Sequence, residues 1–159
     1  MSYEDVYEAI VQNDRETFDA HVDNADLERT SDSGKNLLGT AATLGRDEMA
    51  AELIDRGIDL NVQNEEGKSP LHLALEKGHD DVVRLLIERG IALDIADEHG
   101  NQPLWRAVFK GNYEMTELLV EHGADPTHEN EAGKSPLSLA RDAGAEKFVA
   151  LLERVAGSE

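Results

Sequence analysis

The sequence predicts an all-α protein built from about five helix-turn-helix repeats. The first observation is that glycines recur at a step of 33 residues in three series: Gly34, Gly67, Gly100 and Gly133; Gly45, Gly78, Gly111 and Gly144; and Gly57, Gly90 and Gly123. The second is that apolar residues keep the same phase: Leu38, Leu71, Leu104 and Leu137; Ala41, Ala74, Ala107 and Ala140; and Leu53, Leu86, Leu119 and Leu152. A fixed period of this length indicates repeats that stack and bury a shared core.

Each repeat is expected to contain two helices, as residues 64–96 illustrate. Ser69 can cap a helix N-terminus, and Pro70 follows at the first helical position, where its missing N–H costs nothing. Gly78 is expected to end this helix. The second helix carries the bulkier apolar residues and is expected to end at Gly90. Turn-forming residues then lead into the next repeat.

The two ends of the chain depart from the repeat and are expected to be caps. The N-terminal segment runs one residue out of phase, with Asn13 in the place of Gly45. At the other end, Arg141 and Glu153 occupy positions that are apolar in the inner repeats. Terminal repeats expose one face to water, which explains such polar changes. We therefore expect a complete, single domain over residues 1–159, with repeats at roughly 1–30 (N-cap), 31–63, 64–96, 97–129 and 130–159 (C-cap).

The repeat resembles the ankyrin repeat. The segment Ser69-Pro70-Leu71-His72-Leu73-Ala74 is similar to the Thr-Pro-Leu-His-x-Ala signature of that family, whose period is also 33 residues. Residues 102–107 and 135–140 are looser matches, and 36–41 is weaker and lacks the proline. The resemblance implies a solenoid whose concave face, built from turn tips and first helices, binds other proteins. It also implies a structural role for His72, as a hydrogen-bonding group at the helix start.

No motif in the sequence predicts catalysis, a cofactor or a metal site. Gly67-Lys68-Ser69 resembles the end of a phosphate-binding loop, but Val62 stands where that motif needs its first glycine. No pair of histidines has the spacing of a helical zinc motif, and there is no cysteine. We therefore predict that the chain is not an enzyme. The alternative, an enzyme with a hidden site, would require a cleft where titrating groups converge.

The net charge of −19 sets the expected partners. An acidic surface repels nucleic-acid phosphates and anionic lipids, so neither nucleic acid nor membrane is expected as a partner. The acidic N-terminus is unlike a secretory signal, and a cytoplasmic location is expected. The charge would attract a protein with a basic surface. The alternative is that acidity only keeps the protein soluble.

The repeat at 97–129 breaks the pattern at two positions. Trp105 stands where the other repeats have Gly39, His72 and Ser138. Phe109 stands where they have Thr43, Glu76 and Asp142. Residues four apart share a helix face, and exposed Trp beside Phe is typical of an interface anchor. The alternative is that Trp105 packs locally under a neighbouring turn.

These observations predict a partner-binding site that combines the aromatic pair with turn tips and an acidic surround. The predicted site residues are Trp105, Phe109, Lys110, Tyr113, Glu65, Glu66, Glu76, Glu98, His99, Asn101, Asp32 and Leu44. The predicted function is a protein-protein interaction module, monomeric when free, that holds a basic partner. A sharper version is an inhibitor or immunity-type protein for a basic effector. The alternative is a structural or self-associating adaptor without an inhibitory role.

Overall fold

A computed structural model describes residues 2–157 and shows two compact parts, with the boundary between Ile91 and Ala92. We call residues up to Ile91 the N-terminal part and residues from Ala92 the C-terminal part. The described residues form helices joined by turns and loops, which confirms the predicted all-α class. No helix within residues 2–157 is both long enough and apolar enough to span a membrane.

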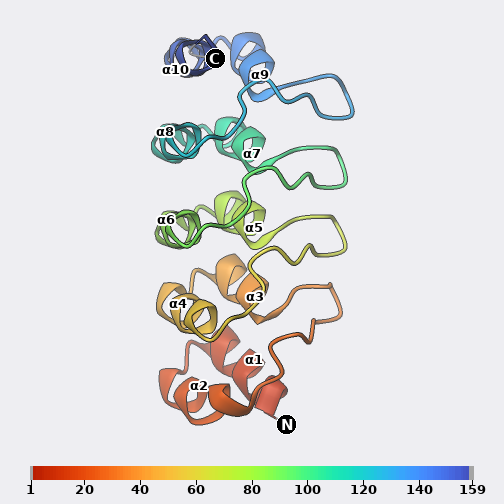
Figure 1. Ribbon diagram of the computed structural model, residues 1–159, viewed down its shortest axis with the longest axis vertical. Coiled ribbons are helices and arrows are strands. Elements are labelled where there is room, and N and C mark those ends of the chain that lie inside the picture. The colour runs from red at the N-terminus through yellow and green to blue at the C-terminus, as the bar shows by residue number, and fades with distance from the viewer. Residues whose placement is uncertain (1, 158–159) are drawn as a thin grey trace. The chain divides into compact units, whose positions relative to one another are not determined.

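The N-terminal part contains three helix pairs that stack on one another (Figure 1). Its elements are α1 (Ser2–Gln12), α2 (Arg15–His21), the 3-10 turn η1 (Val22–Asn24), α3 (Leu37–Leu44), α4 (Asp47–Asp55), α5 (Pro70–Lys77) and α6 (Asp80–Glu88). The first helices of successive pairs pack together, α1 on α3 and α3 on α5, and α4 packs on α6.

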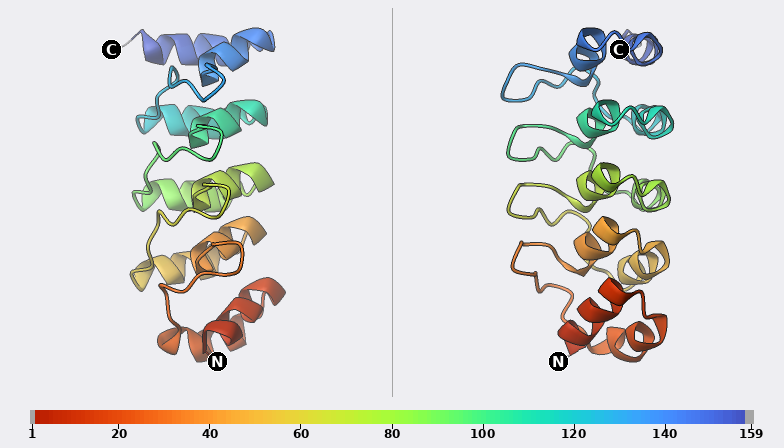
Figure 2. Two further views of the ribbon diagram at one scale, coloured as in Figure 1. Left: turned by 90° about the vertical axis from the view of Figure 1, so that its right-hand side faces the viewer. Right: turned by 180° about the vertical axis from the view of Figure 1, so that it is seen from behind.

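The C-terminal part contains two further helix pairs. Its elements are α7 (Pro103–Phe109), α8 (Tyr113–Glu121), α9 (Pro136–Asp142) and α10 (Glu146–Ala156). Helix α7 packs on α9, and α8 packs on α10. Within each part the long loops project on the side of the first helices (Figure 2).

The first helices begin at the caps that the sequence predicts. The Ser69 hydroxyl accepts a hydrogen bond from the His72 amide at the start of α5, and the His72 Nδ1 accepts one from the Ser69 amide at 3.1 Å. Pro70 occupies the first helical position. In α3, which lacks the proline, the Asn36 side chain accepts from the Gly39 amide at 3.0 Å. These contacts confirm the cap at Ser69 and the structural role of His72.

The substitution Ser69→Ala is expected to lower the free energy of unfolding by about 1–2 kcal/mol. Ser69 is fully buried, and its loss leaves the His72 amide without its cap. Urea denaturation followed by circular dichroism measures this change. Ser33→Ala, which removes an exposed hydroxyl, is the control and should change stability by less than about 0.5 kcal/mol. A Ser69→Ala variant as stable as this control would show that the cap contributes nothing.

A left-handed residue ends the first helix of several pairs. Gly45 caps α3 with φ of 73°, and Gly78 caps α5 with φ of 75°. At the corresponding place in the N-terminal pair, Asn13 has φ of 57°, the one positive φ of a non-glycine residue within 2–157. Asparagine tolerates this conformation better than most residues. The structure therefore confirms that the first pair is a shifted copy of the repeat.

The loop tips are closed by side chains that accept backbone hydrogen bonds. Asp97 accepts from the amides of His99 and Asn101 at 2.9 and 3.0 Å. Neighbouring tips are also joined, because the Glu131 amide donates to the His99 carbonyl at 3.0 Å. In the N-terminal part, the Glu65 amide donates to the Ser33 carbonyl at 3.0 Å in the same way. The tips are thus fixed to one another within each part.

The core of the C-terminal part determines which face of α7 is left outside. Leu104, Ala107 and Val108 are buried, as are Met115 and Leu119 of α8. Because the helical repeat is about 3.6 residues, positions 105 and 109 lie beside one another on a different face. The candidate site is built on that face.

Candidate functional site

Trp105 and Phe109 form a stacked pair on α7. Their ring centroids are 5.1 Å apart and the ring planes differ by 12°. Trp105 is half-buried, whereas 58% of Phe109 is exposed. Among residues 2–157 the exposed large apolar side chains are Phe109 and Val11, and Val11 exposes only 38%. The structure thus confirms that the two rings share a helix face, with Phe109 as the outer member.

Two other repeats carry an ion pair at the positions that correspond to Asn101 and Phe109 in the repeat at 97–129. The Lys68 Nζ lies 3.0 Å from Glu76, and the Lys134 Nζ lies 3.0 Å from Asp142, with the same spacing along the chain. Burial acts to lower the pKa of Lys68, but the hydrogen bond and the charge of Glu76 outweigh it, so the pKa lies above its ordinary value. Each pair ties a loop tip to the end of a first helix.

The repeat at 97–129 has replaced both members of this ion pair. Asn101 stands at the lysine position and Phe109 at the carboxylate position. Asn101 is buried, with 6% exposed, and its Oδ1 accepts a hydrogen bond from Asn130 at 2.8 Å. Asn101, which the sequence places at a turn tip of the predicted site, is therefore buried, and its side chain holds two loops together. Phe109 consequently takes no part in an ion pair of this kind.

The charged groups against the aromatic pair are cations. The Arg106 guanidinium lies 5.8 Å from the Trp105 ring centroid and 5.6 Å from that of Phe109. Lys110 follows Phe109 directly and is exposed. The sequence predicts an acidic surround, but Glu76 pairs with Lys68, and Glu98 lies 3.4 Å from His99 at a loop tip. Within the C-terminal part, the immediate surroundings of the rings are therefore basic.

An apolar cavity of about 350 Å³ opens beside Phe109, and we call it the α7–α9 pocket. The ends of α7 and α9 and the start of α10 form it, with Val108, Phe109, Leu139, Ala143, Ala145 and Phe148 among its lining residues. Small residues open this space. Ala145 stands where the other repeats have the longer Arg46, His79 and Asn112, and Ala143 stands where they have Leu44, Lys77 and Lys110.

Tyr113 joins the site through the far wall of the pocket. Its ring meets Phe148 edge-on, with centroids 5.4 Å apart and an interplanar angle of 81°. The Lys147 Nζ lies 3.9 Å from the centre of the Tyr113 ring. Sequence reasoning missed Phe148. Its counterparts Met49, Val82 and Met115 are buried, and the larger ring at this position was the available signal.

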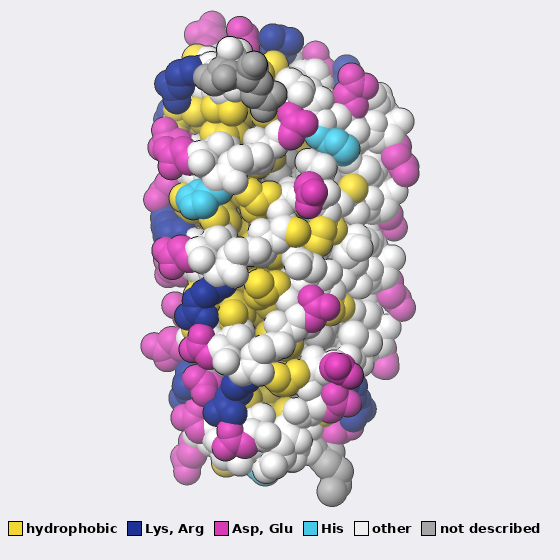
Figure 3. Space-filling view, in the orientation of Figure 1, with side chains coloured by type: hydrophobic (Ala, Val, Ile, Leu, Met, Phe, Trp, Pro, Cys, Tyr) yellow, Lys and Arg dark blue, Asp and Glu magenta, His cyan; other side chains and the backbone are white. Residues whose placement is uncertain are grey.

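The other predicted site residues lie in the N-terminal part. Asp32, Glu65 and Glu66 are exposed in loop tips, and Leu44 is half-buried at the end of α3. In Figure 3, Asp and Glu side chains are spread widely over the face of the molecule that is in view. Glu66 also lies 3.5 Å from Lys68, beside the ion pair with Glu76. Asp32 also lines an open cavity of about 340 Å³ together with Tyr3, Tyr7 and Arg29.

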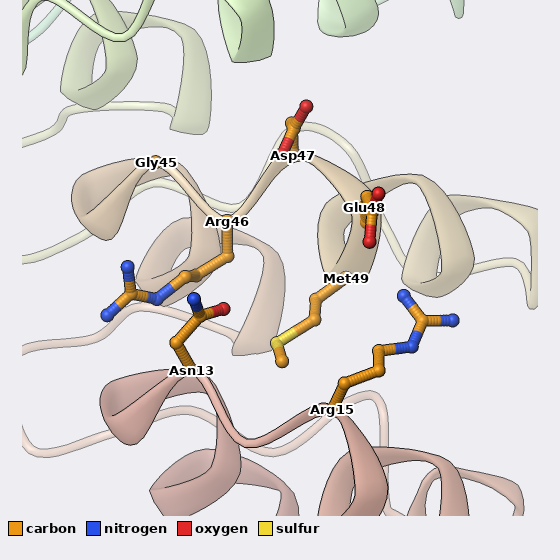
Figure 4. Close-up of a pocket in the computed structure, with 7 residues that line it drawn as sticks. All are labelled: Asn13, Arg15, Gly45, Arg46, Asp47, Glu48 and Met49. Carbon is orange, nitrogen blue, oxygen red and sulfur yellow. The ribbon is translucent and has the colours of Figure 1, made fainter.

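A second, polar cavity of about 260 Å³ lies in the N-terminal part (Figure 4). Arg15 and Arg46 line it, but both cations already have partners. Arg46 donates to the carbonyls of Ile10 and Val11 at 2.9 and 3.0 Å, and Arg15 pairs with Asp19 at 2.9 Å. The described residues contain no group of three His, Asp or Glu side chains that could hold a metal ion. Both cations of this cavity are therefore already used in contacts within the first two helix pairs.

The comparisons with known proteins agree with the repeat geometry. The search of curated proteins gives no match. A family model that describes ankyrin repeats in three copies matches residues 6–98 and 38–130, and so covers most of the chain. The same residues contain the capped helix pairs and the Ser69–Ala74 signature segment. The chain belongs to the ankyrin repeat family.

Proposed function

We propose that this chain is a non-catalytic protein-binding module whose contact centre is the Trp105–Phe109 pair. Ankyrin repeats generally bind proteins, and the matched family is a repeat scaffold. The observation that carries the proposal is the exposed Phe109 at a position where two other repeats have an ion-paired carboxylate. An exposed ring adds little to the core, and aromatic side chains are enriched at the centres of interfaces, so a partner that covers Phe109 would explain its presence.

The arrangement of the pair suits a protein contact. Aromatic side chains contribute strongly to interfaces, because they bury a large apolar area with few rotatable bonds. Phe109 is held by its stack on Trp105 and by its place on α7, so little conformational freedom remains to be lost on binding. Arg106, which lies against both rings, adds a cation that can reach polar groups at the rim.

The substitution Phe109→Ala is expected to weaken capture of the partner at least about tenfold. Phe109 is exposed, so its removal leaves the core intact. The measurement uses immobilised full chain and an extract of the cells that make it, with bound proteins quantified by mass spectrometry. Val11→Ala is the matched control, because it trims the other exposed large apolar residue within 2–157.

The proposal requires at least one bound protein that depends on Phe109 and not on Val11. If every captured protein binds the Phe109→Ala variant and the wild type equally, the contact centre is elsewhere. If the wild type instead forms dimers whose amount rises with concentration, and Phe109→Ala abolishes them, the chain is a self-associating adaptor. Sedimentation of the purified chain measures this outcome.

A basic partner, including a cationic effector that the chain would inhibit, is the second candidate. The N-terminal part carries 21 acidic and 9 basic residues, and Asp32, Glu65 and Glu66 expose carboxylates at its loop tips. Such a field speeds the approach of a cationic protein. We expect the association rate to fall about tenfold or more when salt is raised from low to physiological levels. An association rate independent of salt would contradict this candidate.

A further inference from the structure

We infer that the α7–α9 pocket receives a large apolar side chain of the partner, from a segment that also carries carboxylates. This inference rests on the proposed function and specifies the chemistry recognised at the same site. It concerns the segment that contacts the pocket, and the charge of the partner as a whole is a separate matter.

The size and the lining of the pocket fit one apolar side chain. Its volume of about 350 Å³ lies at the lower end of the range of small-ligand sites, about 300–1,000 Å³. Phe109 and Phe148 stand among the lining residues, with Val108, Leu139 and three alanines. A leucine or phenylalanine inserted here would meet apolar groups from α7, α9 and α10. Because Phe109 extends into solvent, a partner's surface must also cover its outer face.

The charges around the pocket favour a segment with carboxylates. Arg106 lies against Trp105 and Phe109, Lys110 follows Phe109, and Lys147 lies over Tyr113. Within residues 2–157, none of these three cations has an ion pair with a carboxylate. Most other basic side chains do have such a pair, for example Lys134 with Asp142 and Arg141 with Glu153. Three unneutralised cations around one apolar cavity attract carboxylates and repel lysine or arginine.

Carboxylates are sparse along α7 and the turn that follows it. Residues 99–113 contain Arg106 and Lys110 but no Asp or Glu, in a chain with 34 acidic residues. Glu146 lines a different cavity, together with Arg141 and Glu153. The charged groups in contact with the rings, Arg106 and Lys147, are therefore opposite in sign to the net charge of −19. A partner drawn to the acidic surface at long range would present an acidic, apolar segment to this one place.

Fluorescence of Trp105 provides a direct test, because it is the sole tryptophan of the chain and stacks on Phe109. Three short synthetic peptides without tryptophan are titrated into the full chain. The first has a central Phe flanked by Glu, the second replaces each Glu by Lys, and the third replaces the Phe by Ser. We expect the first to shift the emission of Trp105 and to bind at least about tenfold more tightly than the other two.

Two pairs of variants test whether binding occurs in this pocket. Lys110→Glu should weaken the first peptide about fivefold or more, whereas Lys77→Glu, the same position one helix pair earlier and in the N-terminal part, should change it less than about twofold. Ala143→Leu fills the pocket and should abolish binding. Ala132→Leu adds the same group at an exposed loop tip and should have no effect.

Peptide-binding results that contradict this inference can be told apart from results that contradict the proposed function. Equal or tighter binding of the lysine peptide would overturn the inferred chemistry and leave Phe109-dependent capture unaffected. The absence of any shift of Trp105 emission up to about 1 mM of the first peptide would show that the pocket does not accept such a segment. Loss of the proposed function would instead be seen as capture that does not depend on Phe109.

Discussion

Replacing both Trp105 and Phe109 by alanine is expected to weaken partner binding by about 3 kcal/mol, or roughly 150-fold. The two rings form one apolar surface, since they stack at 5.1 Å with nearly parallel planes. The double variant removes the whole surface, whereas Phe109→Ala alone leaves Trp105 available for a partner. Isothermal titration calorimetry with the purified partner measures both affinities.

The two single variants should not add up to the double variant. Because Trp105 supports Phe109 directly, we expect a coupling energy of about 1 kcal/mol between the two positions. Trp105 is half-buried, so thermal unfolding of each variant must accompany the binding data. Effects that add fully would show that the rings act as separate contacts. A double variant that binds like the wild type would remove the aromatic pair from the interface.

The repeat architecture could be predicted from sequence because its signals are local. A helix cap needs a few neighbouring residues, as at Ser69, Pro70 and His72. The left-handed Asn13 could be placed because it stands where later repeats have a glycine. The periodic Leu and Ala positions gave the buried faces of the helices in the same way. Each of these features could be predicted by comparing one repeat with the next.

The α7–α9 pocket could not be predicted, because it depends on small side chains and rings from several elements that meet only in the folded protein. Ala143 and Ala145 matter only because Phe109 and Phe148 lie beside the space that they leave. The burial of Asn101 likewise depends on Asn130, which belongs to the next loop. Side chains that meet across a fold leave no periodic signal in the sequence. The aromatic pair itself was visible only as a break in a pattern that was otherwise regular.

The changes at Asn101 and Phe109 belong together. In two other repeats a lysine and a carboxylate at these positions link the loop tip to the end of the first helix. In the repeat at 97–129 the hydrogen bond between Asn101 and Asn130 holds the loop instead. A carboxylate at position 109 is therefore not needed for this purpose. Phe109 can then face outward without loosening the loop. The repeat thus keeps its structure while one position becomes available for binding.

Gly45→Ala is expected to lower the free energy of unfolding by about 3 kcal/mol, well beyond the cost of the same change at Gly78. Both glycines end a first helix with nearly the same positive φ, so alanine costs about 1–2 kcal/mol of backbone strain at either one. A Cβ at Gly78 would meet nothing within 4 Å, whereas a Cβ at Gly45 would lie 2.6–2.9 Å from ring atoms of His79. That ring would have to move and break its 3.1 Å hydrogen bond to the Thr43 carbonyl.

Urea denaturation of Gly45→Ala, Gly78→Ala and the double variant Gly45→Ala/His79→Ala separates strain from collision. In the absence of the His79 ring, the alanine at position 45 should cost only the strain measured at position 78, about 1–2 kcal/mol relative to His79→Ala alone. The bond from His79 joins the turn after α5 to the end of α3, so the extra cost measures how firmly these pairs are held. Equal costs for Gly45→Ala and Gly78→Ala would mean that the ring moves freely. The bond from His79 would then contribute little to the stacking of these pairs.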